Sequence, residues 1–329
     1  KTRNIHRRDF LKLTGIGAVT LFLGQARDVF ALSKSRITIA TGTMGGIYFV
    51  IGGGIARLLT KYTSAESVAE ITTGSLENCE LVAAKRSHLG LTTADTAYDA
   101  FRGAGRFQGS PVPLRILAAL YPNLTHIICL DKKKIATIAD LKGKLVSVGS
   151  KGSATEAIAA RILSAANLDH GSDLKKLNMG ASESAAALKD GYIDAYIWSG
   201  GIPAASIREL AEQPGLRITV IDHANLVPVM NRKYGPIYYK STIPVETYKG
   251  LADDVVVSTV ANLLVCHKDM EEQTAYTVLK VIFEHLKELS SVHKEANRID
   301  LKAGASLNLI PYHPGARKFF SEHGLTVPV

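Results

Sequence analysis

The stretch "ITIATGTMGGIYFVIGGGIARLL" (residues 37–59) decides how the chain is interpreted. A short β-branched run at Ile37–Ala40 predicts a strand, and the apolar run Tyr48–Tyr62 predicts a helix. Between them lies the glycine-rich turn Thr41–Gly46. A strand, such a turn and a helix N-terminus together form a site for anions. The turn lacks the Gly-x-Gly-x-x-Gly order, and no Gly-Lys-Ser/Thr follows it, so the usual nucleotide motifs are disfavoured.

Strands and helices alternate along the rest of the chain, which predicts βαβ units and a parallel sheet. We expect two α/β lobes, with the chain leaving the first near residues 124–130 and returning near residues 261–267. The expected strands are Ile37–Ala40, Val68–Thr72, Leu89–Thr92, Ile116–Leu120, Thr125–Leu130, Leu145–Val148, Ala195–Trp198, the run "LRITVI" and part of the apolar run Val255–Asp269. The expected helices are Tyr48–Tyr62, Leu76–Lys85, Thr96–Phe101, a short one before the strand Leu145–Val148, Ala154–Ala166, one on each side of the strand Ala195–Trp198, and a long one over about Glu272–Ser290.

Five small, polar turns follow the expected strands. They are Thr41–Gly46, Thr72–Asn78, Thr92–Thr96, Ser150–Thr155 and Ser199–Pro203. One such turn alone is explained by ordinary helix capping. Five turns divided between two lobes favour a shared site, because ligands of open α/β sheets bind at the carboxyl ends of strands. Backbone N–H groups at several helix starts can bind a carboxylate without help from lysine or arginine.

Composition and motifs exclude several classes of function. Of the formal charge of +9, residues 1–31 carry six basic and two acidic groups, or +4, which leaves +5 for the remainder. This net charge is mild, and the sequence contains no run of basic residues interleaved with aromatic ones, so nucleic-acid binding is disfavoured. Neither a Gly-x-Ser-x-Gly elbow nor a His-Glu-x-x-His motif is present, and the three cysteines, Cys79, Cys129 and Cys266, are too dispersed for a zinc site. We therefore expect no catalytic residues, no metal and no cofactor, and we interpret the cysteines as buried and inert.

The amino-terminal residues resemble an export signal. Twin arginines at Arg7 and Arg8 open the sequence "RRDFLK", and a moderately apolar stretch runs from Leu13 to Leu23. This apolar stretch is too short to span a bilayer, which takes about 20 residues. The pattern is similar to a twin-arginine (Tat) signal peptide over residues 1–31, with expected cleavage after Ala31. It predicts a periplasmic protein.

Taken together, the motifs resemble the TAXI-type solute-binding proteins of tripartite ATP-independent periplasmic (TRAP) transporters. The matching pieces are "TGTMGGIYFVIGGGIARLL", "TTGSLENCELV", "LGLTTADTAYDA", "IADLKGKLVSVGSKGSAT", "LKDGYIDAYIWSGGIPAASIREL" and "STIPVETYKGLADDVVVSTVANLLV". The resemblance implies a type II periplasmic binding fold that closes over a small carboxylate. It also implies a membrane permease as partner, with the carboxylate being an amino acid such as glutamate, or a dicarboxylate or keto acid such as 2-oxoglutarate. Val50 stands where the family usually has a proline.

Residue boundaries and ligand-binding residues follow from this interpretation. Lobe 1 is expected over residues 32–125 plus 260–329, and lobe 2 over residues 126–259. The predicted ligand-binding residues are Thr41, Thr43 and Tyr48 from the first turn, Ser75 and Asn78 from the second, Thr93 and Asp95 from the third, Ser153 and Thr155 from the fourth, and Trp198, Ser199 and Gly200 from the fifth. Lys151 is an optional charge partner. Asp95 is either the counter-ion of a ligand amine or a helix cap.

Two other functions remain open at this stage. A Tat signal also fits an exported enzyme that folds around a cofactor, although no cofactor motif was found. The same binding fold can serve a signalling partner rather than a transporter. A monomer is expected for a protein that shuttles a solute to a permease.

Overall fold

The computed structural model describes residues 36–44 and 46–328. Within them, ten strands form one mixed sheet in the order β2-β1-β3-β10-β4-β7-β5-β6, with β8 paired to β4 and β9 paired to β10. The strands are β1 Arg36–Ala40, β2 Glu66–Glu70, β3 Leu89–Thr93, β4 Leu114–Leu130, β5 Leu145–Ser147, β6 Lys175–Leu177, β7 Ala195–Gly200, β8 Ile218–Val220, β9 Tyr239–Ile243 and β10 Val255–His267. The helices are α1 Ile47–Tyr62, α2 Ser75–Ala83, α3 Ala94–Arg102, α4 Ala154–Ala165, α5 Ala181–Lys189, α6 Ala205–Ala211, α7 Val227–Tyr234, α8 Glu272–Glu284, α9 Leu286–Ser290, α10 Leu301–Gly304 and α11 Pro314–Glu322.

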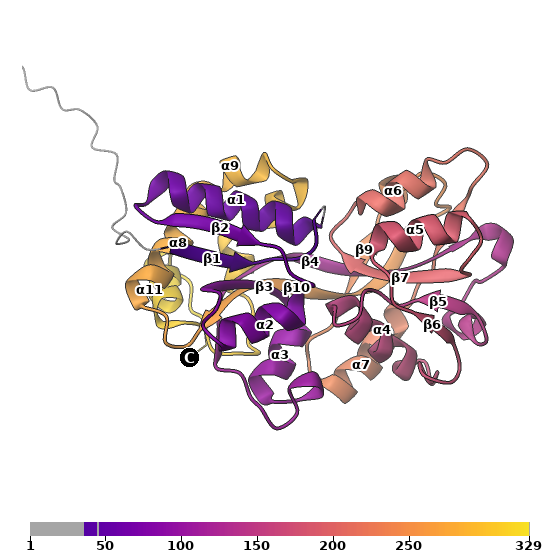
Figure 1. Cartoon of the computed structure of the whole chain (residues 1–329), viewed down its shortest axis with the longest axis horizontal. Helices are drawn as coiled ribbons and strands as arrows, with labels where there is room; N and C mark the ends of the chain where they lie inside the picture. The colour runs from indigo at the N-terminus through magenta and orange to yellow at the C-terminus, as the bar shows by residue number, and fades with distance from the viewer. Residues whose placement is uncertain (1–35, 45, 329) are drawn as a thin grey trace, which may run out of the picture.

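Two long antiparallel strands, β4 and β10, join the two ends of the molecule (Figure 1). The amino-terminal part of β4 pairs with β10, and its carboxyl-terminal part pairs with β7 and β8. Fifteen of the seventeen residues of β4 are buried, as expected for a strand covered on both faces. We call the elements β1–β3, α1–α3 and α8–α11 the first half, and the elements β5–β9 and α4–α7 the second half. The predicted lobe boundaries fall inside β4 and β10, where Leu124 is the register partner of Thr259.

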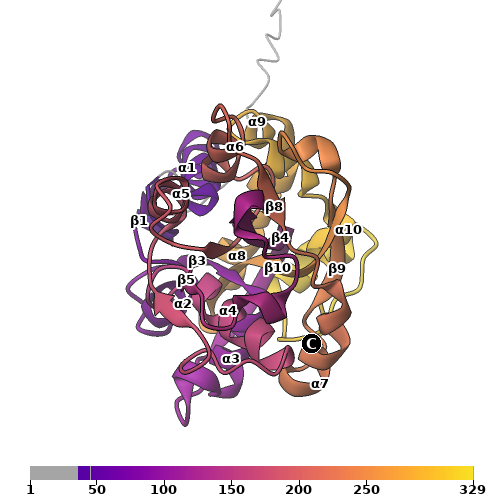
Figure 2. The same cartoon turned by 90° about the vertical axis from the view of Figure 1, so that its right-hand side faces the viewer.

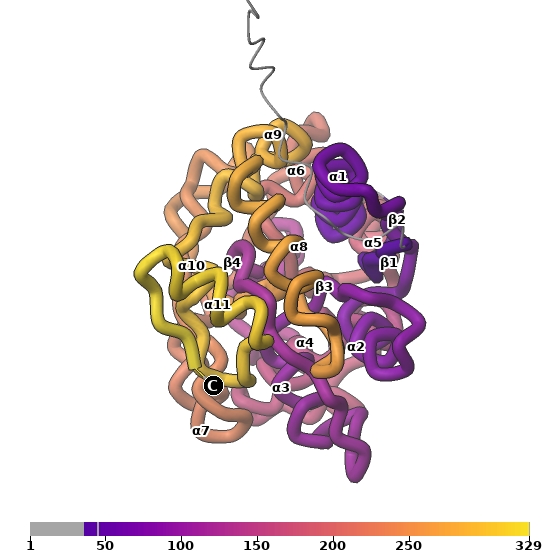
Figure 3. The backbone as a smooth tube through the Cα atoms, turned by 90° about the vertical axis from the view of Figure 1, so that its left-hand side faces the viewer, coloured from indigo at the N-terminus to yellow at the C-terminus, as the bar shows by residue number. Residues whose placement is uncertain are grey.

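Helices cover the sheet in both halves. In the first half α1 packs on β1 and β2, while α8 and α11 pack together at the end remote from the second half (Figure 3). In the second half α4 and α5 pack against β7 (Figure 1), and α6 packs against α5 (Figure 2). In each half parallel strands lead into helices, so the carboxyl ends of β1, β2 and β3 share one edge of the sheet.

The glycine run of the opening stretch permits a close contact between α1 and β1. A Cβ atom added at Gly52 would lie 2.4 Å from Cγ2 of Thr41, a distance that only the absence of a side chain allows. Gly54 is similarly close to Leu289, whereas a Cβ at Gly53 would meet nothing within 4 Å. The first of the three glycines therefore brings the start of α1 down onto the end of β1.

Four sequence predictions differ from the structure. The sheet is mixed rather than wholly parallel, because β4 and β10 run against their neighbours. The two strands expected around Pro122 are one strand, because the ladder shifts register next to Pro122, where no N–H is needed. The helix predicted over Glu272–Ser290 is interrupted at His285, which has φ −118° and ψ 27° and stacks on Tyr62. Ser199 and Gly200, expected in a turn, end β7.

The predicted signal peptide lies outside the described residues. Among those that are described, we find no helix with the length and apolar character needed to cross a bilayer.

Candidate functional site

The first predicted turn is held firmly to its neighbours at the end of β1. Thr41 is fully buried, and its hydroxyl donates a 2.6 Å hydrogen bond to the carbonyl of Glu70. The amide of Thr72 donates to the carbonyl of Gly42, which ties the first two turns together. Thr43 is exposed. Thr41 therefore shapes the turn, and Thr43 lies at its surface.

The second and third turns form one buried unit. The side-chain amide of Asn78 donates to the carbonyls of Thr41 and Leu91, both at 2.6 Å, and its oxygen accepts from Thr72. The hydroxyl of Ser75 accepts from the amide of Thr93 at 3.2 Å. Both N–H groups and the oxygen of the Asn78 side chain are therefore hydrogen-bonded within the protein.

Three helix starts meet at this edge. α1, α2 and α3 follow β1, β2 and β3, and none of the three has a side-chain hydrogen bond from its N-cap residue. The first N–H groups of a helix have no partner within it, and they carry a partial positive charge. The edge of the first half is therefore suited to an anionic group.

A chain of polar side chains connects this edge to the second half across β10 and β4. The hydroxyl of Tyr48 donates a 2.6 Å hydrogen bond to Oδ1 of Asn262, and the amide of Asn123 donates to the same oxygen at 3.0 Å. The hydroxyl of Ser199 donates to the side-chain oxygen of Asn123 and lies 3.2 Å from the hydroxyl of Thr125. We call Tyr48, Asn262, Asn123 and Ser199 the crossing network.

The fourth turn completes the second-half side. Ser153 caps α4 by accepting from the amide of Glu156, and the hydroxyl of Thr155 accepts from the amide of Ser199 at 3.3 Å. Lys151 is exposed. The indole of Trp198 is partly exposed and leaves no room for a side chain at Gly200, where a Cβ would lie 2.8 Å from Nε1.

Asp95 is fully buried and is bound within the protein. Its Oδ2 accepts a 2.9 Å hydrogen bond from the hydroxyl of Tyr238, and Nη1 of Arg161 lies 3.5 Å away. Its Oδ1 accepts from the amide of Thr96. Both carboxylate oxygens therefore have partners.

Glu295 joins the two halves at another point. Its carboxylate is 2 % exposed, and Oε1 accepts a 2.9 Å hydrogen bond from the amide of Ile202, just after β7. A Cβ at Gly201 would lie 2.7 Å from Cγ of Glu295. Burial raises the pKa of Glu295, against the opposing effects of the Ile202 amide and Arg298.

Two buried polar atoms near the crossing network have no hydrogen-bond partner in the part of the chain that the structure describes. They are the hydroxyl of Tyr121 and Oε2 of Glu295. Burial raises the pKa of Tyr121, and Tyr48 and Glu295 raise it further, so these groups lie close enough to interact electrostatically. Unpaired buried polar groups are costly and rare, so each of them calls for an explanation.

The sequence patterns did not point to Tyr121, Asn123, Asn262 or Glu295. Asn123 and Asn262 lie inside strands, where asparagine is uncommon. A polar asparagine within an otherwise apolar strand was the one feature of the sequence that could have indicated them. No signal was available for Glu295, which lies far along the chain in the short helical turn Lys294–Arg298.

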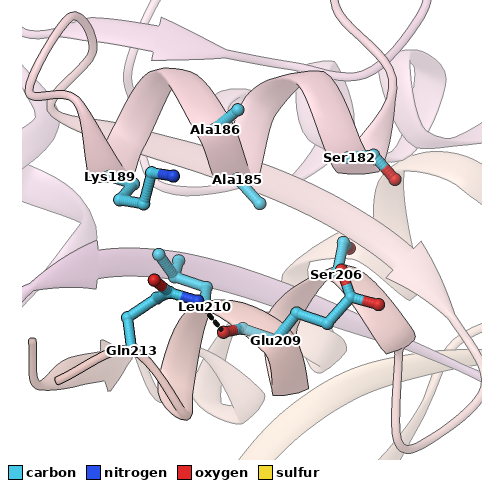
Figure 4. Close-up of a pocket in the computed structure, with 8 residues that line it drawn as sticks. All are labelled: Ser182, Ala185, Ala186, Lys189, Ser206, Glu209, Leu210 and Gln213. Atoms are coloured by element: carbon cyan, nitrogen blue, oxygen red, sulfur yellow. Dashed lines mark hydrogen bonds between the residues drawn. The ribbon is translucent and has the colours of Figure 1, made fainter.

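Two surface grooves lie elsewhere. One, of about 140 Å³, runs between α5 and α6, where Figure 4 shows Lys189, Glu209 and Gln213 around it. The other, of about 540 Å³, lies between α1 and β2. Neither contains a predicted site residue.

This arrangement, two groups of parallel strands joined by crossing strands, is the fold of periplasmic binding proteins. The aliphatic sulphonate binding protein SsuA from Escherichia coli is 15% identical, with a TM-score of 0.50 over 89% of this chain and 80% of that one. A protein from Bordetella bronchiseptica RB50 is 17% identical, with a TM-score of 0.53 over 87% and 88%. Tv2483, solved with L-arginine bound, is 11% identical, with a TM-score of 0.50 over 81% and 90%.

The family follows from the sequence itself. The chain belongs to the NMT1-like family, whose pattern matches residues 39–324.

Proposed function

We propose that this protein is a periplasmic receptor that binds a small carboxylate between its two halves, without catalysis, and delivers it to a TRAP-type membrane permease. The observation that carries the proposal is the convergence of three helix starts without N-cap side-chain hydrogen bonds, next to the crossing network. Free N–H groups at these helix starts stabilise a carboxylate, although the amide of Thr96 in α3 already donates to Oδ1 of Asp95. The periplasmic binding fold and the TAXI-like motifs support the receptor role.

The ligand contacts that we propose come from both halves. Ser75 and Thr93 supply first-half hydroxyls beside the helix starts, and Ser153, Thr155 and Ser199 supply second-half hydroxyls. Tyr48 and Trp198 provide aromatic walls. Thr41 and Asn78 act behind them by fixing the turns, and the roles proposed for Thr43 and Gly200 are through their backbone.

The charge near the site favours an amino acid among the carboxylates. Glu295 is buried, and its Oε2 has no hydrogen-bond partner in the described chain and forms only a long ion pair with Nε of Arg298, at 4.0 Å. A ligand ammonium group would pair with this oxygen, whereas a second ligand carboxylate would be repelled. Because Asp95 is already paired, we assign the counter-ion role to Glu295.

The test uses a panel of acids that contains one matched pair, L-glutamate and 2-oxoglutarate, which differ only at the carbon that carries the amine. We would measure thermal unfolding of the purified protein with L-glutamate, L-glutamine, 2-oxoglutarate, succinate, L-arginine and ethanesulphonate. A ligand at 100 times its dissociation constant adds about 2.7 kcal/mol to the unfolding free energy. We expect a shift with an amino acid and a smaller one with its keto analogue. No shift with any acid, from protein freed of bound solutes by denaturation and refolding, would contradict the proposal.

The residue assignment is tested by calorimetric titration of Glu295→Gln. We expect at least tenfold weaker binding of the amino acid and little change for the keto acid. Equal losses for both would show that Glu295 does not contact the amine.

The permease partner needs a separate test. Vesicles carrying the permease should take up the ligand only when this protein is present, and uptake should continue without ATP. Uptake that requires ATP would contradict a TRAP partner.

A further inference from the structure

A buried charged cluster joins the two halves between α3 and α4. Nη2 of Arg161, on α4, donates a hydrogen bond to Oδ2 of Asp99 on α3. Nη1 of Arg161 donates to the hydroxyl of Tyr238 at 2.9 Å and lies 3.5 Å from Oδ2 of Asp95. The three charged side chains are 11 %, 18 % and 0 % exposed for Arg161, Asp99 and Asp95. The ring of Tyr234 lies 4.7 Å from the guanidinium carbon.

The cluster is not what fixes either helix within its own half. α3 packs on β10 and on α2 and β3 of the first half, and α4 packs on β7 and α7 of the second, with Ala97, Ala100, Ile158 and Ile162 buried. These apolar contacts remain whether or not the halves touch. Both carboxylates that pair with Arg161, however, come from the opposite half. The energy of the cluster therefore depends on how the two halves sit relative to each other.

We call the arrangement in which Arg161 of the second half contacts Asp95 and Asp99 of the first half the closed arrangement. Removing the guanidinium would destabilise this arrangement most. With α3 against α4, Asp95 and Asp99 would remain buried without their cation, and an uncompensated buried charge costs several kcal/mol. If the halves separate, both carboxylates reach water and most of this cost disappears. Loss of Arg161 should thus move the equilibrium toward separated halves rather than simply unfold the protein.

We propose that Arg161 is a positioning residue that holds the free protein in the closed arrangement seen here, by pairing with Asp95 and Asp99 across the two halves. The consequence for affinity rests on the proposed function; the consequence for closure does not. A receptor whose competent state is populated to a fraction f binds with an apparent dissociation constant equal to the intrinsic value divided by f. Arg161 thereby raises affinity without touching the ligand.

The direct test measures the distance between the halves. Ile71 and Tyr192 are 57% and 66% exposed and lie in different halves, so the double variant Ile71→Cys/Tyr192→Cys accepts two spin labels. The native cysteines are fully buried and should not react. Pulsed electron spin resonance then reports the distribution of distances in the full chain without ligand.

Three variants on this background separate closure from stability. We expect the parent to show mainly the distance of the closed arrangement, and Arg161→Met to show a second, different distance in at least half of the molecules. Arg161→Lys keeps the charge but not the two-pronged geometry, and should fall between them. The matched control is Lys133→Met, which breaks the half-buried pair of Lys133 and Asp194, 2.8 Å apart within the second half. It should leave the distance unchanged.

Affinity supplies the second measurement. For an acid that binds the parent, the fold-loss of affinity in Arg161→Met should equal the fold-loss of the closed fraction, and Lys133→Met should show none. If no acid binds, the distances still decide the proposal, so its failure is distinct from failure of the proposed function. If Arg161→Met does not fold, Asp99→Asn takes its place, with a smaller shift expected. Identical distributions in the parent and the cluster variants, or a parent without the closed distance, would overturn the proposal.

Discussion

Asn262 is the residue on which the crossing network depends most. Its side chain makes three hydrogen bonds, accepting from Tyr48 and Asn123 and donating to the carbonyl of Tyr121 at 3.1 Å. It is fully buried, so water cannot easily replace these bonds in an Asn262→Ala variant. Leaving a buried polar group unpaired costs about 1–3 kcal/mol. Since some of the three groups will relax, we expect a loss of about 3 kcal/mol in the free energy of unfolding.

Thermal unfolding measures this loss. With an unfolding entropy of about 2.1 cal/mol/K per residue, the midpoint should fall by roughly 5 °C for a chain of this size. The matched control is Asn178→Ala, which removes two side-chain hydrogen bonds, to Gly149 and Glu156, where Asn262→Ala removes three, but from an exposed position. Its midpoint should change by less than about 2 °C, because water takes over the lost bonds. Equal changes in the two variants would refute the reasoning that burial gives the network its energetic weight.

Three further predictions concern pH, backbone and thiols. Burial lowers the pKa of His126 from 6.5 to about 4, so between these pH values the unfolded chain binds more protons than the folded one. As the pH falls from 6.5 to 4, His126 should therefore lower the free energy of unfolding by about 1.4 kcal/mol per pH unit. Denaturant titrations should show a shallower pH slope in His126→Gln but not in the exposed-site control His170→Gln. Gly149→Ala should lower the free energy of unfolding by about 2 kcal/mol or more, because φ is +91° and the new Cβ would lie 2.7 Å from Thr155. The control Gly152→Ala has φ +78° but no atom within 4 Å of the new Cβ, and should cost only about 1 kcal/mol. Equal costs in the two variants would exclude the clash with Thr155. A thiol reagent should modify no cysteine in the native protein and three after denaturation, because burial raises the pKa of each; rapid native labelling would contradict this for Cys79, Cys129 or Cys266.

Local sequence patterns were sufficient to predict most of the strands and helices of the first half. The strand at Ile37–Ala40 and the helix ending at Tyr62 were predicted within one residue, because β-branched residues, glycines and apolar periodicity all point the same way there. Around Pro122 and His285 the sequence misled. Pro122 looked like a strand end but stands where the ladder is irregular, and His285 has no helix-breaking chemistry of its own. Both outcomes depend on partners far along the chain.

The candidate site could be predicted from the sequence only in part, for the same reason. Residues at helix starts, such as Ser75 in α2 and Thr155 in α4, can be proposed from the sequence because turn and capping chemistry is local. The partners of Asp95 are not, since Arg161 and Tyr238 lie 66 and 143 residues away. A sequence shows which side chain can carry a charge, but only the packing of the halves shows whether that charge is already paired.

This distinction separates affinity from selectivity in the proposed receptor. The contacts of Arg161 with Asp99, and of Glu295 with the amide of Ile202, join the same two halves, so they form in the same closed state. They favour every ligand that this state accepts by the same factor, because a change in its population cannot distinguish between ligands. Discrimination must come from groups without a hydrogen-bond partner inside the protein, and near the crossing network the described chain offers the Tyr121 hydroxyl and Oε2 of Glu295. Substituting Arg161 should therefore weaken all ligands alike, while Tyr121→Phe or Glu295→Gln should change their order.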